Sequence, residues 1–328
     1  MRFLLTDEQR EFARTLDGML GASGTPAVVR AWAAGEQKPG RELWARVAAA
    51  DVFALAVPER HRGMGPLPAE LALSFVELGR HAVPGPLVET VAAAAFWERL
   101  GEEAGAEAGV WLPRIATGDA LVSLCVGAPY ALDADAADAV LVVQGDTVRR
   151  TDTHGPVQPS LDPARRLARP LGGTVVARGP AVTAAAAHAV DVARLATAAQ
   201  SLGLGRALLA ATVSHAERRT QFQVPIGSFQ AVKHRLADTL LGLEFAQPLV
   251  YAAALALAAG APSAGREVAA AKVAAGEAGY AAARTALQLH GALGYTAELD
   301  LSLWIRKARP LRDAWGTPAE CRARVLAG

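Results

Sequence analysis

The residues whose chemistry stands out lie in the C-terminal third of the chain. Arg219 and Gln230 share one polar segment, and the run Gln288-Leu289-His290-Gly291-Ala292 follows further along. A guanidinium is planar and permanently charged, which makes it a good partner for a phosphate group. Glycine lets a ligand approach the backbone closely because it has no side chain. These residue types indicate a site for a phosphate-bearing ligand, with a solvated helix-end arginine and a helix C-cap as the simpler alternatives.

Two titratable residues near these segments are candidates for proton transfer. Histidine as a residue type titrates near neutral pH and can serve as a general base, but we interpret His290 as structural or ligand-adjacent. We interpret Asp313 as a surface carboxylate that pairs with Arg309 or Arg312. We predict no metal site.

The composition favours close-packed helices. Of the 328 residues, 52% are hydrophobic and only 5% aromatic, so the apolar content is mostly Ala, Leu and Val. Ala and Leu have high helix propensity, and small side chains let helices approach one another. The 33 basic and 32 acidic residues leave a net charge of +1 without a basic block. We therefore expect neither nucleic acid nor an anionic membrane surface as a partner.

The sequence predicts a soluble cytoplasmic protein. Cys125 and Cys321 are far apart and are expected to be reduced thiols rather than a disulfide. The apolar start at residues 1–5 is too short for the core of a signal peptide. The most apolar stretch, near residues 249–261, falls below the roughly 20 residues that span a bilayer.

Apolar periodicity divides the chain into three parts. We predict an all-helical N-terminal domain (1–112), a shortened middle β domain (113–180) and a C-terminal helical bundle (181–328). Thr6 marks the first helix start, and a turn is expected at residues 35–40. The strand predictions are 121–126, 139–143, 147–149 and 174–177.

Two expectations concern one long helix of the C-terminal bundle. Val232, Leu236 and Leu240 recur at four-residue spacing and predict a buried stripe. Pro248 is expected to kink or end that helix, because proline lacks a backbone N–H group.

Two long motifs resemble the acyl-CoA dehydrogenase family. Residues 217–234 are similar to the family's Arg-x-Gln-Phe-Gly-x-Pro-Ile-x-x-Phe-Gln segment, and residues 288–296 to its Gln-x-x-Gly-Gly-x-Gly-Tyr/Phe-Thr segment. Residues 57–59, 63–65 and 77–80 also resemble its N-terminal helical domain. The resemblance covers nearly the whole chain and implies that family's fold, a mostly α protein with a small β domain and a C-terminal four-helix bundle.

The resemblance implies an FAD site shared between two subunits. Arg219 and Gln230 would reach the pyrophosphate and adenosine side of FAD in a neighbouring subunit, and Phe222 would pack against it. The turn at residues 288–292 would bring backbone close to the same cofactor, and Thr317 would also contact it. Ala292 replaces the family's second glycine, so the approach at this point is expected to be less close.

The chain departs from the family where catalysis takes place. Trp315 stands where most members carry the carboxylate base, and Ala193 stands where a minority carry it. The resemblance therefore implies no catalytic residue here. Residues 125–133 replace the family's Thr-Glu-Pro-Gly-x-Gly-Ser-Asp segment, so contacts to the chain's own flavin are lost as well.

This pattern resembles the base-lacking subunit of actinobacterial α2β2 heterotetrameric acyl-CoA dehydrogenases, some of which act in lipid or steroid catabolism. The implied partners are a homologous subunit with the catalytic Glu, an acyl-CoA bound by the complex, and electron-transfer flavoprotein. Two alternatives stay open. One is a self-sufficient dehydrogenase with a relocated base, for which Asp313 is a weak candidate and Glu298 and Asp300 lie nearby. The other is a flavin-free scaffold or a repurposed flavoprotein of a biosynthetic cluster.

Overall fold

A computed structural model of the chain describes residues 5–327 and divides them into two compact units. The first unit comprises residues up to 26, 72–83 and 194 onward, and the second comprises residues 27–71 and 84–193. The three predicted domains were divided by the type of secondary structure along the chain. Each of the two compact units instead combines segments from more than one predicted domain. Of the predicted apolar start, residues 1–4 lie outside the described part.

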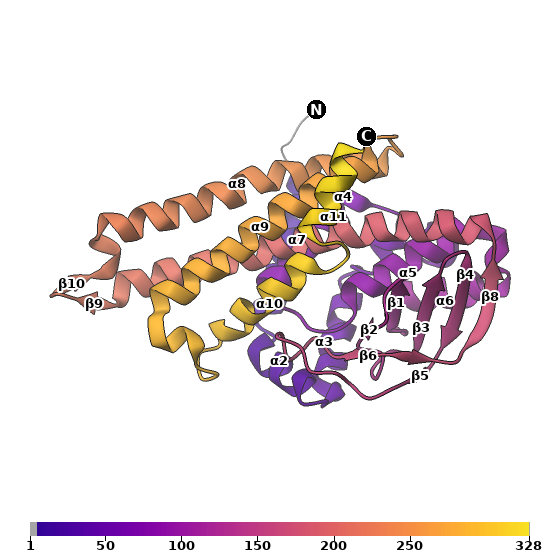
Figure 1. The fold of residues 1–328 in the computed structure, drawn as a ribbon, viewed down its shortest axis with the longest axis horizontal. Helices are drawn as coiled ribbons and strands as arrows, with labels where there is room; N and C mark the ends of the chain where they lie inside the picture. Colours follow the sequence, from indigo (N-terminus) through magenta and orange to yellow (C-terminus); the bar gives the residue numbers. More distant parts are fainter. Residues whose placement is uncertain (1–4, 328) are drawn as a thin grey trace. The chain divides into compact units, whose positions relative to one another are not determined.

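The first unit is a helical bundle. Its N-terminal helix has the predicted cap, because the Thr6 hydroxyl accepts from the Gln9 backbone N–H group at 3.1 Å. A short hairpin joins the two longest helices (Figure 1). The elements that lie wholly or partly in this unit are α1 (Asp7–Gly21), α4 (Pro68–Arg80), α7 (Pro180–Arg218), β9 (Thr220–Gln221), β10 (Val224–Pro225), η4 (Ile226–Ser228), α8 (Gln230–Ala258), α9 (Ala264–His290), η5 (Gly291–Tyr295), α10 (Leu301–Asp313) and α11 (Pro318–Leu326).

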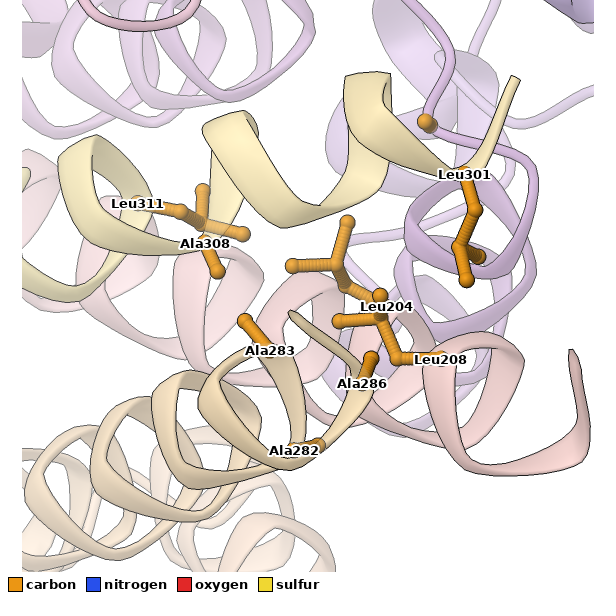
Figure 2. Packing of buried hydrophobic residues seen from close by; sticks show 9 residues of the cluster. Leu204, Leu208, Ala282, Ala283, Ala286, Leu301, Ala308 and Leu311 are labelled. Carbon is orange, nitrogen blue, oxygen red and sulfur yellow. The ribbon is translucent and has the colours of Figure 1, made fainter. Parts of the chain in front are cut away.

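Small side chains form much of the core of this bundle. Alanines on α9 face two leucines of α7 and the inner side of α10, as Figure 2 shows. Because alanine projects little beyond the backbone, the helices can pack closely here. The cluster consists of Ala82, Leu204, Leu208, Ala282, Ala283, Ala286, Leu301, Ala308 and Leu311.

The second unit contains a four-stranded sheet with the order β1-β3-β4-β8. β1 (Val122–Val126) pairs in parallel with β3 (Ala139–Gln144), while β3, β4 (Thr147–Thr151) and β8 (Thr174–Arg178) are antiparallel neighbours. These are the strands predicted from the apolar runs, and the prediction is confirmed. The two-residue strands are β2 (Ala131–Leu132), β5 (Thr153–His154), β6 (Leu167–Ala168) and β7 (Pro170–Leu171).

Helices pack around this sheet within the same unit. The Thr90 hydroxyl of α5 donates to the Val122 carbonyl at 2.8 Å and accepts from its N–H group at 3.2 Å, which ties α5 to the edge strand β1. The remaining elements are α2 (Thr25–Ala33), α3 (Gln37–Ala49), η1 (Ala54–Ala56), η2 (Glu59–His61), α5 (Leu87–Leu100), η3 (Gly101–Ala104) and α6 (Ala106–Ala116).

The predicted turn at residues 35–40 is only partly correct. Helix α3 already begins at Gln37, so Gly40 lies inside the helix and is buried. A Cβ atom on Gly40 would lie 2.2 Å from the Trp32 ring. Glycine therefore serves close packing of α3 against α2 at this position and does not form the turn.

Two predictions were made for helix α8. Its buried positions are Thr239, Leu243, Ala246, Val250 and others in register with them, whereas the predicted stripe was wrong because Leu240 is 47% exposed. The helix continues through Pro248, so it does not end there, and a kink at this residue stays a prediction. Helix α8 thus has two apolar stripes. Helix α9 packs against α8, and the buried stripe is not the one predicted from the sequence.

Helix α8 is also the one helix in the described part that is long and apolar enough to cross a membrane by length and composition. Its apolar stretch is longer than the one considered in the sequence, and 28% of its most apolar window is buried in this chain. The exposed side includes Leu240, Leu241, Phe245 and Leu249. Buried core helices of ordinary proteins pass the same test of length and composition.

Candidate cofactor site and base-position loop

The motif residues of the first segment surround the short hairpin after α7. Arg219 follows the last residue of α7, and its backbone N–H group donates to the His215 carbonyl at 2.8 Å. Its guanidinium is exposed and makes no hydrogen bond or ion pair with any residue in the range 5–327. Gln230 is the first residue of α8 and is exposed as well. Both side chains are therefore accessible to a ligand.

Phe222 lies at the tip of the hairpin and is 87% exposed. Its φ of 52° is in the left-handed region, which bulky residues rarely adopt. The ring makes an edge-to-face contact with Phe229, with centroids 6.3 Å apart. The ring is therefore held away from the core, where it is accessible to a ligand or a partner chain.

The second motif forms the end of α9. Gln288, Leu289 and His290 are its last residues, and Gly291 is the C-cap with a φ of 60°. Ala292 follows in η5 and is exposed. The backbone of this segment therefore forms a helix C-cap, which was the simpler alternative. The Gln288 side chain lies beside the cap and is exposed.

Side-chain contacts bring the two motifs to the same end of the bundle. The His290 ring is buried, contacts the Ala286 carbonyl through Nδ1 at 2.9 Å and stacks on His215 with centroids 4.0 Å apart. Burial lowers the pKa of His215, and the neighbouring His290 and Arg219 lower it further. His290 thus links the end of α9 to the end of α7, so the two motif segments lie close together.

Arg235 was not predicted from the sequence. It lies on the second turn of α8 and donates through Nη1 to Oε1 of Gln288 at 2.5 Å. This contact joins α8 to α9 next to the candidate ligand site. In the sequence, Arg235 is one of many arginines on a helix face. It lies outside the residues that carry the motif, so no sequence signal distinguished it.

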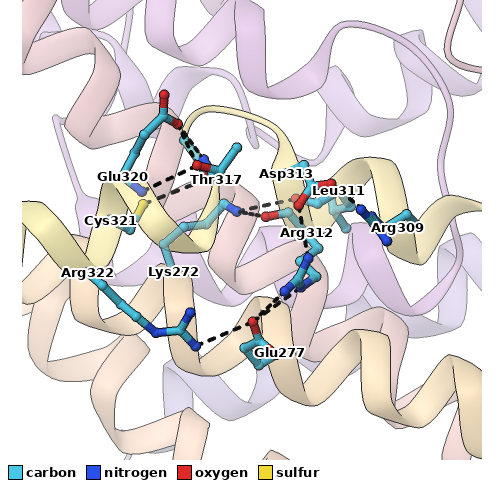
Figure 3. A network of polar contacts seen from close by, with 11 residues as sticks. Lys272, Glu277, Arg309, Leu311, Arg312, Asp313, Thr317, Glu320, Cys321 and Arg322 are labelled. Atoms are coloured by element: carbon cyan, nitrogen blue, oxygen red, sulfur yellow. Dashed lines mark hydrogen bonds and ion pairs between the residues drawn. The ribbon is translucent and has the colours of Figure 1, made fainter.

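The loop that would carry the base follows α10. Trp315 has a φ of 59°, and its carbonyl accepts from Nε of Arg194 at 2.9 Å. Nζ of Lys272 donates to the carbonyls of Leu311 and Arg312 at 3.3 and 2.7 Å, at the C-terminal end of α10 (Figure 3). The loop is therefore fixed from both sides although it contains no glutamate.

The carboxylate nearest to Trp315 in sequence is engaged by two cations. Asp313 accepts from Arg309 at 2.9 Å and from Arg312 at 3.2 Å, as predicted. Thr317 is the N-cap of α11, and its hydroxyl exchanges hydrogen bonds with Glu320. The cofactor role of Thr317 stays a prediction, and its hydroxyl is used in the cap.

Ala193 on α7 is fully buried. An alanine methyl group neither accepts nor donates a proton, so Ala193 cannot act as the base that the resemblance would place at this position. Cys125 and Cys321 are both free thiols and both buried, in agreement with the prediction.

The base-position loop and the cofactor motif lie beside different parts of α9. Lys272 lies in the first half of that helix and Gln288 at its end. With a rise of 1.5 Å per residue, the helix separates these two residues by about 24 Å. The base-position loop and the cofactor motif therefore do not belong to one site within this chain.

Two other polar features of the helical unit lie apart from these motifs. Asp17, Glu77 and His81 bring ligand atoms within 4.8 Å of one another. Nε2 of His81 contacts Asp17 at 2.7 Å, and Arg80 donates to Glu77 at 2.8 Å. Burial raises the pKa of Glu77, and Arg80 opposes that rise. An arginine already compensates the acidic charge of this cluster.

A partly open cavity of about 300 Å³ lies among α1, α4, α7 and α8. Its polar lining residues are Glu77, Arg206, Glu244, Gln247 and Tyr251. Arg206 bridges to Glu244 at 3.2 Å. None of the predicted site residues lines this cavity.

Comparison with known proteins establishes the family. Residues 183–327 match the family model for the acyl-CoA dehydrogenase C-terminal domain, and residues 6–119 match the model for the N-terminal domain. The chain is 33% identical to acyl-CoA dehydrogenase IpdE2 of Mycobacterium tuberculosis over 325 residues, covering 97% of this chain and 96% of that protein. The chain therefore belongs to the acyl-CoA dehydrogenase family.

Solved structures confirm the fold. The ChsE4-ChsE5 complex from Mycobacterium tuberculosis includes a chain with a TM-score of 0.84 and 23% identity, covering 100% of this chain and 98% of that one. A variant of the Tcur3481-Tcur3483 steroid ACAD also has a TM-score of 0.84 and 23% identity, covering 98% and 97%. At this identity the likeness concerns the fold alone, and the predicted mostly α architecture with a small β region is correct.

Proposed function

We propose that this chain is the partner subunit of a heteromeric FAD-dependent acyl-CoA dehydrogenase. In that complex the chain lends cofactor contacts to a homologous subunit, which carries the base for α,β-desaturation of an acyl-CoA thioester. The observation that carries the proposal is the contrast between two sites. Trp315 lies in a fixed loop at the position that the resemblance assigns to the base, while Arg219, Phe222 and Gln288 remain exposed.

The exposed residues fit part of a flavin dinucleotide. The Arg219 guanidinium has the charge and planar donors that a pyrophosphate requires. The Gln288 amide can both donate and accept hydrogen bonds, and the Phe222 ring offers an apolar surface. When bound, FAD supplies the hydride acceptor of the reaction. The residues of this chain would hold the dinucleotide and exclude water from it.

The chain's own base position does not support proton abstraction. The Trp315 indole has no group that accepts a proton from a substrate carbon, and its N–H group is a donor only. Asp313 is paired with two guanidinium groups, which restrain its side chain. This arrangement weighs against the relocated-base alternative.

The exposed apolar side of α8 supports a protein partner. Leu240, Leu241, Phe245 and Leu249 lie on it, with Phe245 73% exposed. Large apolar side chains gathered on one helix face are typical of an interface. A homologous subunit would cover this face and place its cofactor at the adjacent hairpin.

The proposal is tested by comparing the purified chain with the same chain co-expressed with a homologue that carries the glutamate base. We expect the isolated chain to lack stoichiometric FAD and acyl-CoA-dependent dye reduction, and the co-purified complex to have both. Dye reduction by the isolated chain would favour the self-sufficient alternative. A stable complex without FAD would favour the scaffold.

Arg219→Ala tests the assigned contact within the complex. Loss of a charge-assisted hydrogen bond should weaken FAD retention by about 1.5–3 kcal/mol. Retention is measured as bound flavin per complex after dialysis. The control is Arg266→Ala, which removes an exposed arginine at the far end of α9. Equal flavin content in both variants would contradict the role of Arg219.

A further inference from the structure

Two polar contacts, one helical turn apart, join α8 to α9 beside the cofactor motif. Arg235 donates to Gln288 at 2.5 Å, and the hydroxyls of Thr239 and Thr285 are 3.1 Å apart. Moving four residues forward on α8 corresponds to moving three residues back on α9, as expected for antiparallel helices. The threonine pair is buried and the arginine contact is exposed, so the two form a seam that runs from the core to the surface.

The seam determines where the Arg235 backbone lies. Thr239 donates its single hydroxyl proton to the Arg235 carbonyl at 2.8 Å. Thr285 must therefore be the donor in the threonine pair, because each hydroxyl has one proton. The buried contact between Thr239 and Thr285 thus fixes the position of the Arg235 backbone relative to α9. The Arg235 guanidinium reaches Gln288 from this fixed backbone position.

Arg235 also determines the orientation of the Gln288 amide. A guanidinium can only donate, so the atom that it contacts must be the amide oxygen. The amide is planar, with oxygen and nitrogen on opposite sides, so its NH2 group points away from Arg235. Both amide N–H donors therefore remain available to a ligand. If the amide were reversed, its NH2 group would face the N–H groups of Arg235, and no hydrogen bond could form.

We propose that Arg235 is a positioning residue of the cofactor site, which holds Gln288 with its N–H donors turned toward the dinucleotide. This inference rests on the proposed function, since it concerns FAD that this chain helps its neighbour to bind. Arg219 contributes charge directly, whereas Arg235 acts through Gln288. Without Arg235, the exposed glutamine samples other rotamers and amide orientations.

The test measures FAD affinity of the co-expressed complex after removal and re-addition of FAD, followed by the change in flavin fluorescence. We expect Arg235→Met to weaken FAD binding about tenfold. Arg235→Lys should recover part of the loss, because an ammonium can also donate to the glutamine oxygen. Arg266→Met is the matched control and should bind FAD like the wild-type complex.

A double-mutant cycle separates positioning from a general structural effect. Gln288→Ala should weaken FAD binding, and adding Arg235→Met to it should change the affinity by less than about twofold, because both changes remove one contact. Additive losses would overturn the inference, as would wild-type affinity in Arg235→Met. A wild-type complex that binds no FAD would overturn the proposed function and this inference together.

Discussion

At the scale of single residues, the most unusual group is a lysine in the helical core. The Lys272 side chain is 1% exposed and caps the end of α10 with two hydrogen bonds to carbonyls. Burial lowers its pKa from 10.5 to about 8, while Cys321 and Asp313 act in the opposite direction. The unfolded chain therefore binds more protons than the folded chain between about pH 8 and pH 10.5.

This difference predicts that stability rises with pH in the alkaline range. The Lys272 contribution should add about 1 kcal/mol to the free energy of unfolding between pH 7 and pH 9. Urea unfolding at several pH values measures it, and Lys272→Met serves as the reference that lacks the titrating amine. The wild type should gain stability relative to the variant as the pH rises. A constant difference between the two proteins would show that the Lys272 pKa is not lowered.

Sequence reasoning identified residues of extended motifs better than residues whose partners lie far away in the sequence. Arg219 and Gln288 belong to extended motifs, so their neighbours identify them. Lys272 and Arg235 act through contacts between residues that are distant in sequence, 39 positions for the Lys272–Leu311 bond and 53 for the Arg235–Gln288 bond. Such partners depend on the register of two helices, which no local pattern specifies.

At the scale of elements, two glycines allow a close contact between helices α4 and α7. A Cβ atom on Gly203 of α7 would lie 1.8 Å from the Val76 carbonyl oxygen of α4. One on Gly79 of α4 would lie 2.1 Å from the Gln200 carbonyl oxygen of α7. In both cases the added Cβ atom would clash with a backbone carbonyl oxygen. The clash could be removed only if the two helices moved apart.

Gly203→Ala is therefore expected to lower the free energy of unfolding by at least about 2 kcal/mol, because overpacking forces a backbone shift. Gly18→Ala is the matched control, since Gly18 lies within α1 and a Cβ atom there would meet no neighbouring atom within 4 Å. That change should stabilise the chain by about 0.5–1 kcal/mol through helix propensity. Thermal unfolding of both variants tests the pair, and equal effects would contradict the close contact.

The elements themselves were predictable to different degrees. Strands β1, β3, β4 and β8 followed from short apolar runs and a glycine turn, which are local signals. The buried stripe of α8 did not, because α8 is apolar on more than one side and only the packing of α9 distinguishes them. Leu240 and Leu243 are equally apolar, and just one of them faces the core of this chain.

At the scale of the whole molecule, the exposed face of α8 connects fold to assembly. An apolar side chain in water costs free energy that burial in a partner recovers, at about 25 cal/mol per Å². Phe245 and Leu241 are 73% and 52% exposed, on the same helix as Gln230, which is a predicted cofactor contact. In the proposed complex, covering this face and binding the cofactor are therefore parts of one event.

Phe245→Asp should prevent that event. A carboxylate in the centre of an apolar interface would be desolvated without a partner, at a cost above about 2 kcal/mol. The variant is expected to elute separately from the homologous subunit in size-exclusion chromatography with light scattering, and to carry no FAD after co-expression. Leu161→Asp is the control, since Leu161 is 56% exposed in the other compact unit and should leave assembly unchanged. An intact, flavin-loaded complex with Phe245→Asp would show that α8 is not the subunit contact. Loss of FAD without dissociation would instead place Phe245 against the cofactor itself.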